Sequence, residues 1–207
     1  MIYIYIYTKK MWKYLNKKYR FCNNLYTTDK NKKFIIIKNI ISKSLAQQII
    51  EEAENYAKEN KWKTDRHEHY PTVDNVFTEK WTNFHIIENI IQKKIYTEIV
   101  KLYNVKYNQI GINEIFVVKY DMNGQKKLEE HKDGSEFSFI IALNDEYQGG
   151  GTYFTEIKKQ ISLGTGDCLI FSGQNKHKGV QIKSGKRYIL TGFLHFHHRD
   201  YCEEILS

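Results

Sequence analysis

The sequence predicts an α+β protein in which helices come first and a sandwich or barrel of short strands follows. Glycine marks the boundary, because all 12 glycines lie at or after Gly111 and the first 110 residues have none. Tight turns and bulges need glycine, so we expect turn-rich β structure in the second half and mostly helix in the first. Apolar residues at helical spacing before the boundary, and short strand-like runs after it, favour the same division.

Helices are expected over residues 45–59 and 86–103, where apolar residues recur at helical spacing. Ser44 with Gln47 three residues later is a capping-box pattern, which predicts where the first helix begins. Both apolar stripes are most simply explained as core contacts. The earlier apolar run from residue 34 to 41 is much shorter than the roughly 18 residues that span a bilayer, so it predicts a buried strand and no transmembrane segment.

After the glycine boundary, short apolar runs are separated by clusters of Gly, Asn, Asp and Ser, which is typical of a sandwich or barrel. The predicted strands are Ile115–Tyr120, Phe137–Leu143, Thr152–Glu156, Asp167–Phe171, Val180–Ile182 and Arg187–Phe196. We therefore divide the chain into a basic N-terminal arm (1–33), a mostly helical part of the folded unit (34–110) and a β-rich core (111–207).

The net charge of +8 is concentrated in the arm. Residues 1–33 hold nine Lys or Arg against one acid, and the remaining chain has 23 of each sign. Such an arm is suited to nucleic acid or an anionic membrane surface, and a solvated tail is the simpler interpretation. The three cysteines form neither a zinc-ligand spacing nor a disulfide framework, and residues 1–7 place apolar residues before the charges, the reverse of a signal peptide. We expect a soluble intracellular, cytoplasmic protein.

The placement of histidines and carboxylates is the most informative feature. His131 and Asp133 lie at positions i and i+2, so on a strand both side chains point to one face. His177 follows 46 residues after His131, just before another predicted strand. Two histidines and one carboxylate form the facial triad of non-haem Fe(II) oxygenases, which leaves three coordination positions open. The imidazoles bind only when neutral, so metal affinity is expected to fall in acid.

Rival patterns exist. A His-x-Asp pair is expected by chance about 0.3 times in a chain of this composition, and a second one stands at His198–Asp200. It has few possible ligands after it, so an exposed polar tail is the simpler interpretation. Other histidine clusters lie at residues 67–69 and 195–198.

Arg187, ten residues after His177, distinguishes the first pattern from its rivals. A guanidinium is the natural partner for the far carboxylate of a dicarboxylate, because it binds carboxylate through two parallel hydrogen bonds. Thr191 shares a strand face with Arg187, and Tyr120 ends the strand that precedes His131. A lone arginine usually forms a surface ion pair. Because Arg187 follows the His-x-Asp pair and the distal His177 in the sequence, a ligand-binding role is favoured over an ion pair.

If the strands that hold His177 and Arg187 form a hairpin, the length of the loop decides whether both side chains face inward. Both residues face inward if the loop has an odd number of residues, which Lys183–Gly185 provides with Gly185 in the left-handed conformation. A two-residue loop at Ser184–Gly185 requires a bulge near Gly179 instead.

Several stretches resemble the Fe(II)/2-oxoglutarate-dependent dioxygenases, in particular the prolyl and lysyl (procollagen-type) hydroxylase branch. Tyr70-Pro71-Thr72 with Asp74 resembles a segment found before the core of lysyl-hydroxylase-like members. The others are Val117–Tyr120, His131–Ser135 with a strand ending Ala142–Asn144, Gly149–Phe154, and Gly166–Phe171 with His177 and Gly185–Tyr188. Together they cover roughly residues 34–196, and their order makes the resemblance specific.

The resemblance implies a double-stranded β-helix (jelly-roll) core with flanking N-terminal helices. It also implies that Arg187 holds the 5-carboxylate of 2-oxoglutarate, assisted by Tyr120 and Thr191, and that iron is bound by His131, Asp133 and His177. The implied cosubstrates are 2-oxoglutarate and O2, with ascorbate as a further requirement. Collagen-type prolyl hydroxylases usually carry Lys where this chain has Arg187, which favours lysyl hydroxylases or other arginine-using members.

The implied activity is hydroxylation of a prolyl or lysyl side chain in a protein or collagen-like peptide, with decarboxylation of 2-oxoglutarate to succinate and CO2. A non-catalytic jelly-roll module docked on nucleic acid by the basic arm is the alternative. A nucleic-acid demethylase of the same superfamily is disfavoured, because that branch carries a second arginine six residues after the first and position 193 is Phe. Phe139, Ile141 and Leu143 share a strand face that forms either pocket wall or, by default, core.

Overall fold

The computed structural model describes residues 34–67 and 69–196, which belong to a single compact unit. The predicted basic arm and the His198–Asp200 pattern lie outside the described residues. The helical elements are α2 (Lys43–Asn60), α3 (Phe84–Ile90), a π-helical turn (Ile91–Ile95), α4 (Tyr96–Tyr103) and a 3₁₀ turn (Tyr107–Gln109). α3, the π-helical turn and α4 follow one another without a break. None of the described helices is both long and apolar enough to cross a bilayer.

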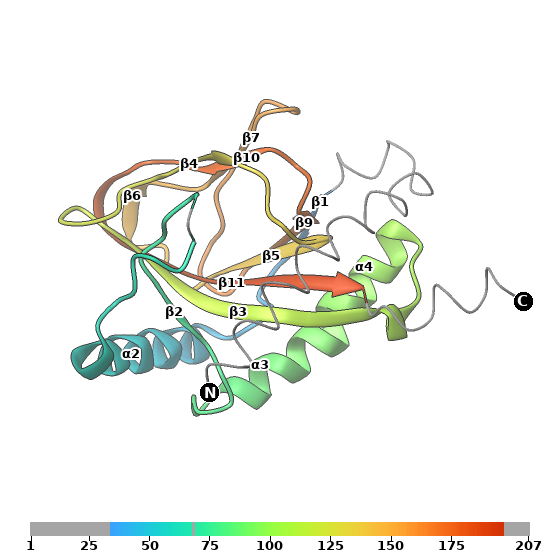
Figure 1. The fold of residues 1–207 in the computed structure, drawn as a ribbon, viewed down its shortest axis with the longest axis horizontal. Helices are drawn as coiled ribbons and strands as arrows, with labels where there is room; N and C mark the ends of the chain where they lie inside the picture. The colour runs from blue at the N-terminus through green and yellow to red at the C-terminus, as the bar shows by residue number, and fades with distance from the viewer. Residues whose placement is uncertain (1–33, 68, 197–207) are drawn as a thin grey trace, which may run out of the picture. The chain divides into compact units, whose positions relative to one another are not determined.

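The strands form two antiparallel sheets (Figure 1). The major sheet has the order β1-β9-β5-β11-β3-β2, and the minor sheet has the order β4-β10-β7-β8. The strand bounds are β1 (Phe34–Ile37), β2 (Asp74–Val76), β3 (Ile110–Asp121), β4 (Leu128–His131), β5 (Phe137–Ala142), β6 (Tyr147–Gly149), β7 (Thr152–Phe154), β8 (Lys159–Ile161), β9 (Cys168–Ser172), β10 (His177–Gly179) and β11 (Ile182–Phe196). This is the predicted combination of flanking helices and a jelly-roll core.

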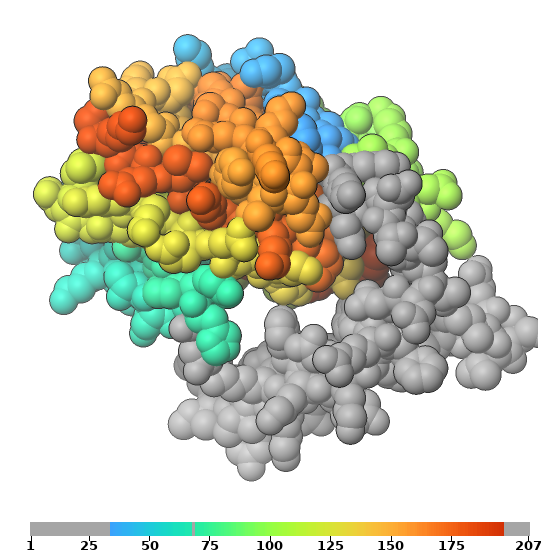
Figure 2. All heavy atoms as spheres, turned by 90° about the horizontal axis from the view of Figure 1, so that it is seen from above, coloured from blue at the N-terminus to red at the C-terminus, as the bar shows by residue number. Residues whose placement is uncertain are grey.

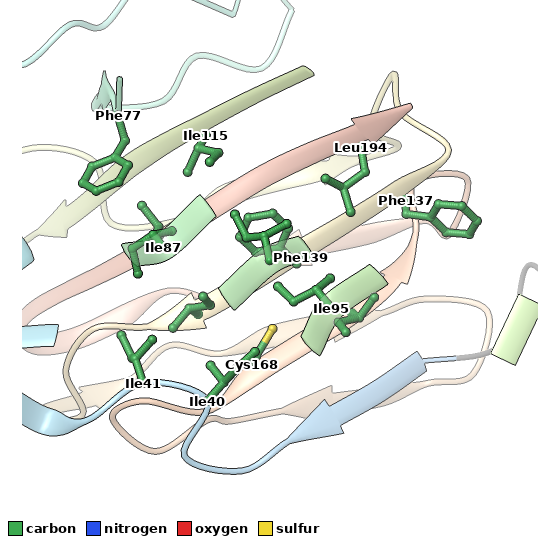
Figure 3. Packing of buried hydrophobic residues seen from close by; sticks show 14 of the residues in the cluster. Ile40, Ile41, Phe77, Ile87, Ile95, Ile115, Phe137, Phe139, Cys168 and Leu194 are labelled. Atoms are coloured by element: carbon green, nitrogen blue, oxygen red, sulfur yellow. The ribbon is translucent and has the colours of Figure 1, made fainter. Parts of the chain in front are cut away.

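The two faces of the major sheet have different partners. Figure 1 shows α2, α3 and α4 on one side of this sheet and β4, β7 and β10 on the other. On the helix side, Ile87 and Ile95 pack beside Phe139 and Leu194 of β5 and β11 (Figure 3). Because side chains alternate along a strand, the neighbouring residues of β5 and β11 face the interior between the sheets.

The interior between the sheets is lined by a second apolar cluster: Phe116, Val118, Tyr120, Ile140, Phe154, Ile161, Leu169, Phe171, Ile182 and Ile189. Phe139, Ile141 and Leu143 belong instead to the helix-side core. The pocket-wall interpretation of these three residues was therefore wrong, and the default interpretation as core is confirmed.

The first helix begins two residues earlier than predicted. Ser42 is its N-cap and accepts a hydrogen bond from the Leu45 backbone N–H at 3.1 Å. Ser44 thus lies inside the first turn and forms no capping box. Ser42 and Ser44 both precede the same apolar stripe and have the same side chain, so the sequence alone does not distinguish which of them caps the helix. Similarly, β1 ends at Ile37, and the buried Ile40 and Ile41 follow it in a turn.

The hairpin between His177 and Arg187 does not form. β10 ends at Gly179 and pairs with β4 and β7, whereas β11 begins at Ile182 and pairs with β3, β5 and β6. Gly185 has the expected positive φ of 79°, but it lies within β11 opposite Tyr147. In a jelly roll, strands that are adjacent in sequence cross from one sheet to the other, and this crossing separates the two strands.

Candidate metal and cosubstrate site

The minor sheet brings two histidines face to face. His131 is the last residue of β4 and His177 the first of β10, and the two are direct partners in the antiparallel register. Their ring centroids are 4.3 Å apart. Asp133 lies just beyond the end of β4, where its backbone N–H donates to the Gly173 carbonyl at 2.9 Å. Asp133 is therefore placed by this loop contact rather than by the strand alternation that the sequence suggested.

The three side chains converge on one point. His131, Asp133 and His177 each offer a ligand atom, and these atoms all lie within 4.8 Å of one another. Nε2 of His131 is 3.4 Å from Asp133 Oδ1, and Nε2 of His177 is 3.8 Å from Asp133 Oδ2. Their side chains are 9%, 7% and 6% exposed. Such a buried group of two imidazoles and a carboxylate fits a ferrous ion.

Backbone carbonyls fix the ring orientation of both histidines. Nδ1 of His131 lies 2.7 Å from the Glu129 carbonyl oxygen, and Nδ1 of His177 lies 2.9 Å from that of Asn175. A carbonyl oxygen only accepts, so in each neutral ring Nδ1 carries the proton and donates it. Nε2 is then left with its lone pair directed at the metal position, which is the arrangement that a metal ligand requires.

The protonation states also suit metal binding. Burial raises the pKa of the Asp133 carboxyl, but the nearby His177 and hydrogen bonds from His131 and Ser138 lower it below its usual value. Burial lowers the pKa of His177, which keeps that imidazole neutral. Burial also lowers the pKa of His131, but its hydrogen bond with Asp133 raises it overall. At neutral pH the group therefore presents an ionised carboxylate beside an imidazole that is ready to bind.

Arg187 lies in the same interior as a buried guanidinium. It is 4% exposed, stands opposite Tyr120 in the β3–β11 register, and its Cζ lies 5.1 Å from the centre of the Tyr120 ring. Among the residues that the structure describes, its Nε has no hydrogen-bond partner. Within residues 34–67 and 69–196, no carboxylate pairs with it. A buried cation without a counter-ion is costly, so this position fits the carboxylate of a bound ligand.

Tyr120 and Thr191 differ in what they offer a ligand. Burial raises the pKa of the Tyr120 phenol, which therefore keeps its proton and can donate it. A Cβ at Gly179 would lie 3.0 Å from the Tyr120 hydroxyl, so the glycine makes room for it. Thr191 shares the strand face of Arg187, but its hydroxyl donates to the Phe139 carbonyl at 2.8 Å. A cosubstrate contact by Thr191 stays a prediction.

The segment before β2, singled out by its resemblance to lysyl-hydroxylase-like members, borders the site, although the sequence did not indicate its contact with His131. The Tyr70 ring lies 5.0 Å from the His131 ring between centroids. Arg66 ties the segment down, since it pairs with the buried Asp74 and, at 2.8 Å, with Glu114. In Figure 2 these teal residues lie beside the yellow segment that holds β4. An aromatic residue next to Pro71 was a weak signal for this contact.

The rival histidine clusters form no metal group in the part of the chain that the structure describes. His67 packs against Phe116 and Phe193, with its Nε2 3.5 Å from Asp74. His195 pairs with Glu136 at 2.7 Å. His131, Asp133 and His177 form the group that meets the geometric requirement among these residues.

Comparisons with known proteins agree with the fold and the site. No family model matches the chain. A procollagen lysyl hydroxylase and glycosyltransferase of Acanthamoeba polyphaga mimivirus is 43% identical over 100 residues, which cover 45% of this chain and 11% of that protein. Procollagen-lysine,2-oxoglutarate 5-dioxygenase 1 of Mus musculus is 30% identical over 173 residues, or 75% of this chain and 23% of that protein. The chain thus spans less than a quarter of the length of these relatives.

Solved structures show the same fold. A viral collagen prolyl hydroxylase from Paramecium Bursaria Chlorella virus-1 superposes with a TM-score of 0.62 at 17% identity, covering 81% of this chain and 98% of that one. A Pseudomonas putida prolyl-4-hydroxylase gives 0.61 at 12% identity, covering 78% and 91%. The fold is thus the jelly roll of these solved structures, and the sequence relatives support the Fe(II)/2-oxoglutarate-dependent dioxygenase superfamily. The sequence relatives place it in the prolyl/lysyl (procollagen-type) hydroxylase branch, as the resemblance predicted.

Proposed function

We propose that this chain is an Fe(II)- and 2-oxoglutarate-dependent dioxygenase that hydroxylates a lysyl or prolyl side chain of a peptide. One observation carries the proposal: a three-residue metal group and a buried guanidinium without a carboxylate partner lie in the same barrel interior. Metal ligands alone are compatible with many chemistries. The added site for a carboxylate is what a dicarboxylate cosubstrate requires.

The donor atoms support iron as the metal. Two imidazole nitrogens and one carboxylate oxygen form the facial set that suits Fe(II) and leaves positions for further ligands. His131, Asp133 and His177 hold the ion in this proposal. When bound, iron and 2-oxoglutarate supply the oxidising chemistry, in which the cosubstrate loses CO2 to become succinate and O2 provides the hydroxyl oxygen.

The remaining residues bind, orient and exclude water. The planar guanidinium of Arg187 receives the 5-carboxylate through two parallel hydrogen bonds, and the Tyr120 phenol donates a third. Phe154 and Phe171 pack around His177, with ring centroids 5.8 and 4.8 Å from the imidazole. These rings keep the inner side of the metal group dry, which strengthens its electrostatic interactions with ligands.

A lysyl target is favoured over a prolyl one. Sequence relatives at 43% and 30% identity are named a procollagen lysyl hydroxylase and glycosyltransferase and a procollagen-lysine,2-oxoglutarate 5-dioxygenase. The use of Arg rather than Lys at position 187 agrees with that assignment. A collagen-like peptide is accordingly the first substrate to test, and ascorbate is the expected additive that keeps the iron reduced. A role of the arm at residues 1–33 in docking nucleic acid stays a separate prediction.

The test is anaerobic binding of Fe(II) and 2-oxoglutarate, followed by turnover with oxygen. Paired collagen-like peptides that differ only in whether they contain Lys or Pro serve as substrates, and mass spectrometry locates the added oxygen atom. We expect peptide-dependent succinate and a modified lysine. If the chain binds both ligands but modifies neither residue, the proposed substrate class is wrong. If it binds neither ligand, the proposed activity is wrong as well.

A further inference from the structure

A buried hydroxyl lies directly beside the metal-binding carboxylate. Ser138 is on β5, with its side chain fully buried, and its Oγ donates to Asp133 Oδ2 at 2.5 Å. Its register partners Phe171 and Phe193 belong to the interior cluster, so Ser138 faces the same interior as the metal group. The contact therefore joins the major sheet to the loop that carries Asp133.

The hydrogen-bond directions in this region are determined. An ionised carboxylate only accepts, so the single Ser138 proton goes to Asp133. The Ser135 hydroxyl, 2.9 Å from Ser138 Oγ, must then be the donor in that contact. Gly173 leaves space for the Ser135–Ser138–Asp133 hydrogen bonds, because a Cβ at position 173 would lie 2.1 Å from the Ser135 carbonyl oxygen. The result is a hydrogen-bond relay in which Ser135 donates to Ser138 and Ser138 donates to Asp133, so every donor and acceptor in it is fixed.

The relay distinguishes the two oxygens of Asp133. Both oxygens lie near a histidine nitrogen, Oδ1 at 3.4 Å from His131 Nε2 and Oδ2 at 3.8 Å from His177 Nε2, but it is Oδ2 that accepts the Ser138 hydrogen bond. A carboxylate that binds through both oxygens occupies two coordination positions, and one that binds through a single oxygen occupies one. With two histidines, the single-oxygen mode leaves three of six positions open, while the two-oxygen mode leaves two.

We propose that Ser138 is a positioning residue that restricts Asp133 to single-oxygen metal binding, with Ser135 fixing the Ser138 hydroxyl in turn. The inference rests on the proposed metal site and deepens it. A cosubstrate that chelates through two atoms, together with O2, needs all three open positions. Ser138 accordingly preserves the position that a two-oxygen Asp133 would occupy.

The test uses the full chain and Co(II), whose visible absorption reports its coordination number. Ser138→Ala removes the donor, Ser138→Thr retains a hydroxyl, and Ser172→Ala is the matched control, because Ser172 is a buried serine on β9 whose hydroxyl accepts from the Gln174 N–H. We expect S138A to weaken Co(II) binding about 10- to 100-fold, as loss of a group that orients a ligand does. We also expect the Co(II) absorption of S138A to differ from that of the wild type, because the second Asp133 oxygen then takes a position that solvent fills in the wild type, while S138T and S172A resemble the wild type.

The outcomes separate this inference from the proposed function. If the wild type binds Co(II) and a folded S138A has the same affinity and spectrum, Ser138 has no positioning role. If S138A does not fold, Ser138→Cys takes its place, because cysteine keeps the side-chain volume but is a weaker hydrogen-bond donor. An unchanged Co(II) spectrum in S138C would likewise show that Ser138 has no positioning role. If the wild type itself binds no Co(II), the metal site and this inference both fail.

Discussion

Replacing Arg187 by Gln separates a ligand-binding role from a structural one. The guanidinium is buried, its Nε has no hydrogen-bond partner within residues 34–67 and 69–196, and it forms a cation–π contact with the Tyr120 ring. If it held the fold together, its loss would destabilise the free protein. If Arg187 instead binds the carboxylate of a ligand, its loss should leave the stability of the free protein unchanged and weaken only the complex with 2-oxoglutarate.

The expected magnitudes differ for the two states. Removing one partner of a buried ion pair costs about 3–5 kcal/mol, which corresponds to a roughly 150- to 5,000-fold rise in the Kd for 2-oxoglutarate. In the free protein, R187Q removes an unpaired buried charge, which is favourable, and a cation–π contact of about 0.5–2 kcal/mol, which is unfavourable. These two effects oppose each other, so the free energy of unfolding without ligand should change little.

Thermal unfolding with and without ligand measures both quantities. With an inert divalent metal present, 2-oxoglutarate at 100 times its Kd stabilises the wild type by about 2.7 kcal/mol, which raises Tm by about 5–11 °C for a chain of this size. R187Q should show almost no rise at the same concentration. Lys186→Gln is the control, since Lys186 is exposed on the same strand. Wild-type affinity in R187Q, or strong destabilisation without ligand, would refute the reasoning.

Three further predictions concern the metal group and the core. Asp133→Ala should abolish peptide-dependent succinate formation without changing the circular dichroism spectrum, and normal turnover would contradict the assigned metal ligand. Co(II) affinity should decline as the pH falls through the pKa of His131, which burial lowers but Asp133 raises overall above its usual value, because only the neutral ring binds metal. In the metal-free chain, protonated His131 stabilises the fold. This contribution is fully present below the unfolded-state pKa of His131 and is lost as the pH rises through its raised folded-state pKa, so the His131 contribution to the free energy of unfolding in urea should decrease as the pH rises. Phe139→Ala should lower the free energy of unfolding by about 3–5 kcal/mol, since this ring is fully buried on the helix side; a selective loss of 2-oxoglutarate binding at full stability would contradict that placement.

The metal group could be predicted from the sequence because its spacing is local to two short segments. His131 and Asp133 are near neighbours, and His177 begins a strand. Ser138 was missed, although it lies five residues after Asp133, since a serine on a predicted strand gives no sign of which buried atom its hydroxyl meets. That contact exists only once β5 and the loop at Asp133 are brought together.

Sheet assignment was the main failure of the sequence-based prediction. The rule that opposed residues share a face holds within one sheet, but β10 and β11 belong to different sheets. Alternation along β5 likewise separates Phe139 from Ile140 without indicating which of them faces the helices. Both faces of this strand are apolar, because one packs on helices and the other lines the barrel.

The register that sets His131 opposite His177 would also make the stability of the minor sheet depend on the proposed iron. An ion held there clamps two segments 46 residues apart in the chain. Any opening that separates β4 from β10 must release the ion, so free iron shifts this local equilibrium toward the closed form by mass action. Without the ion, the same edge would open more often and be more accessible to a protease.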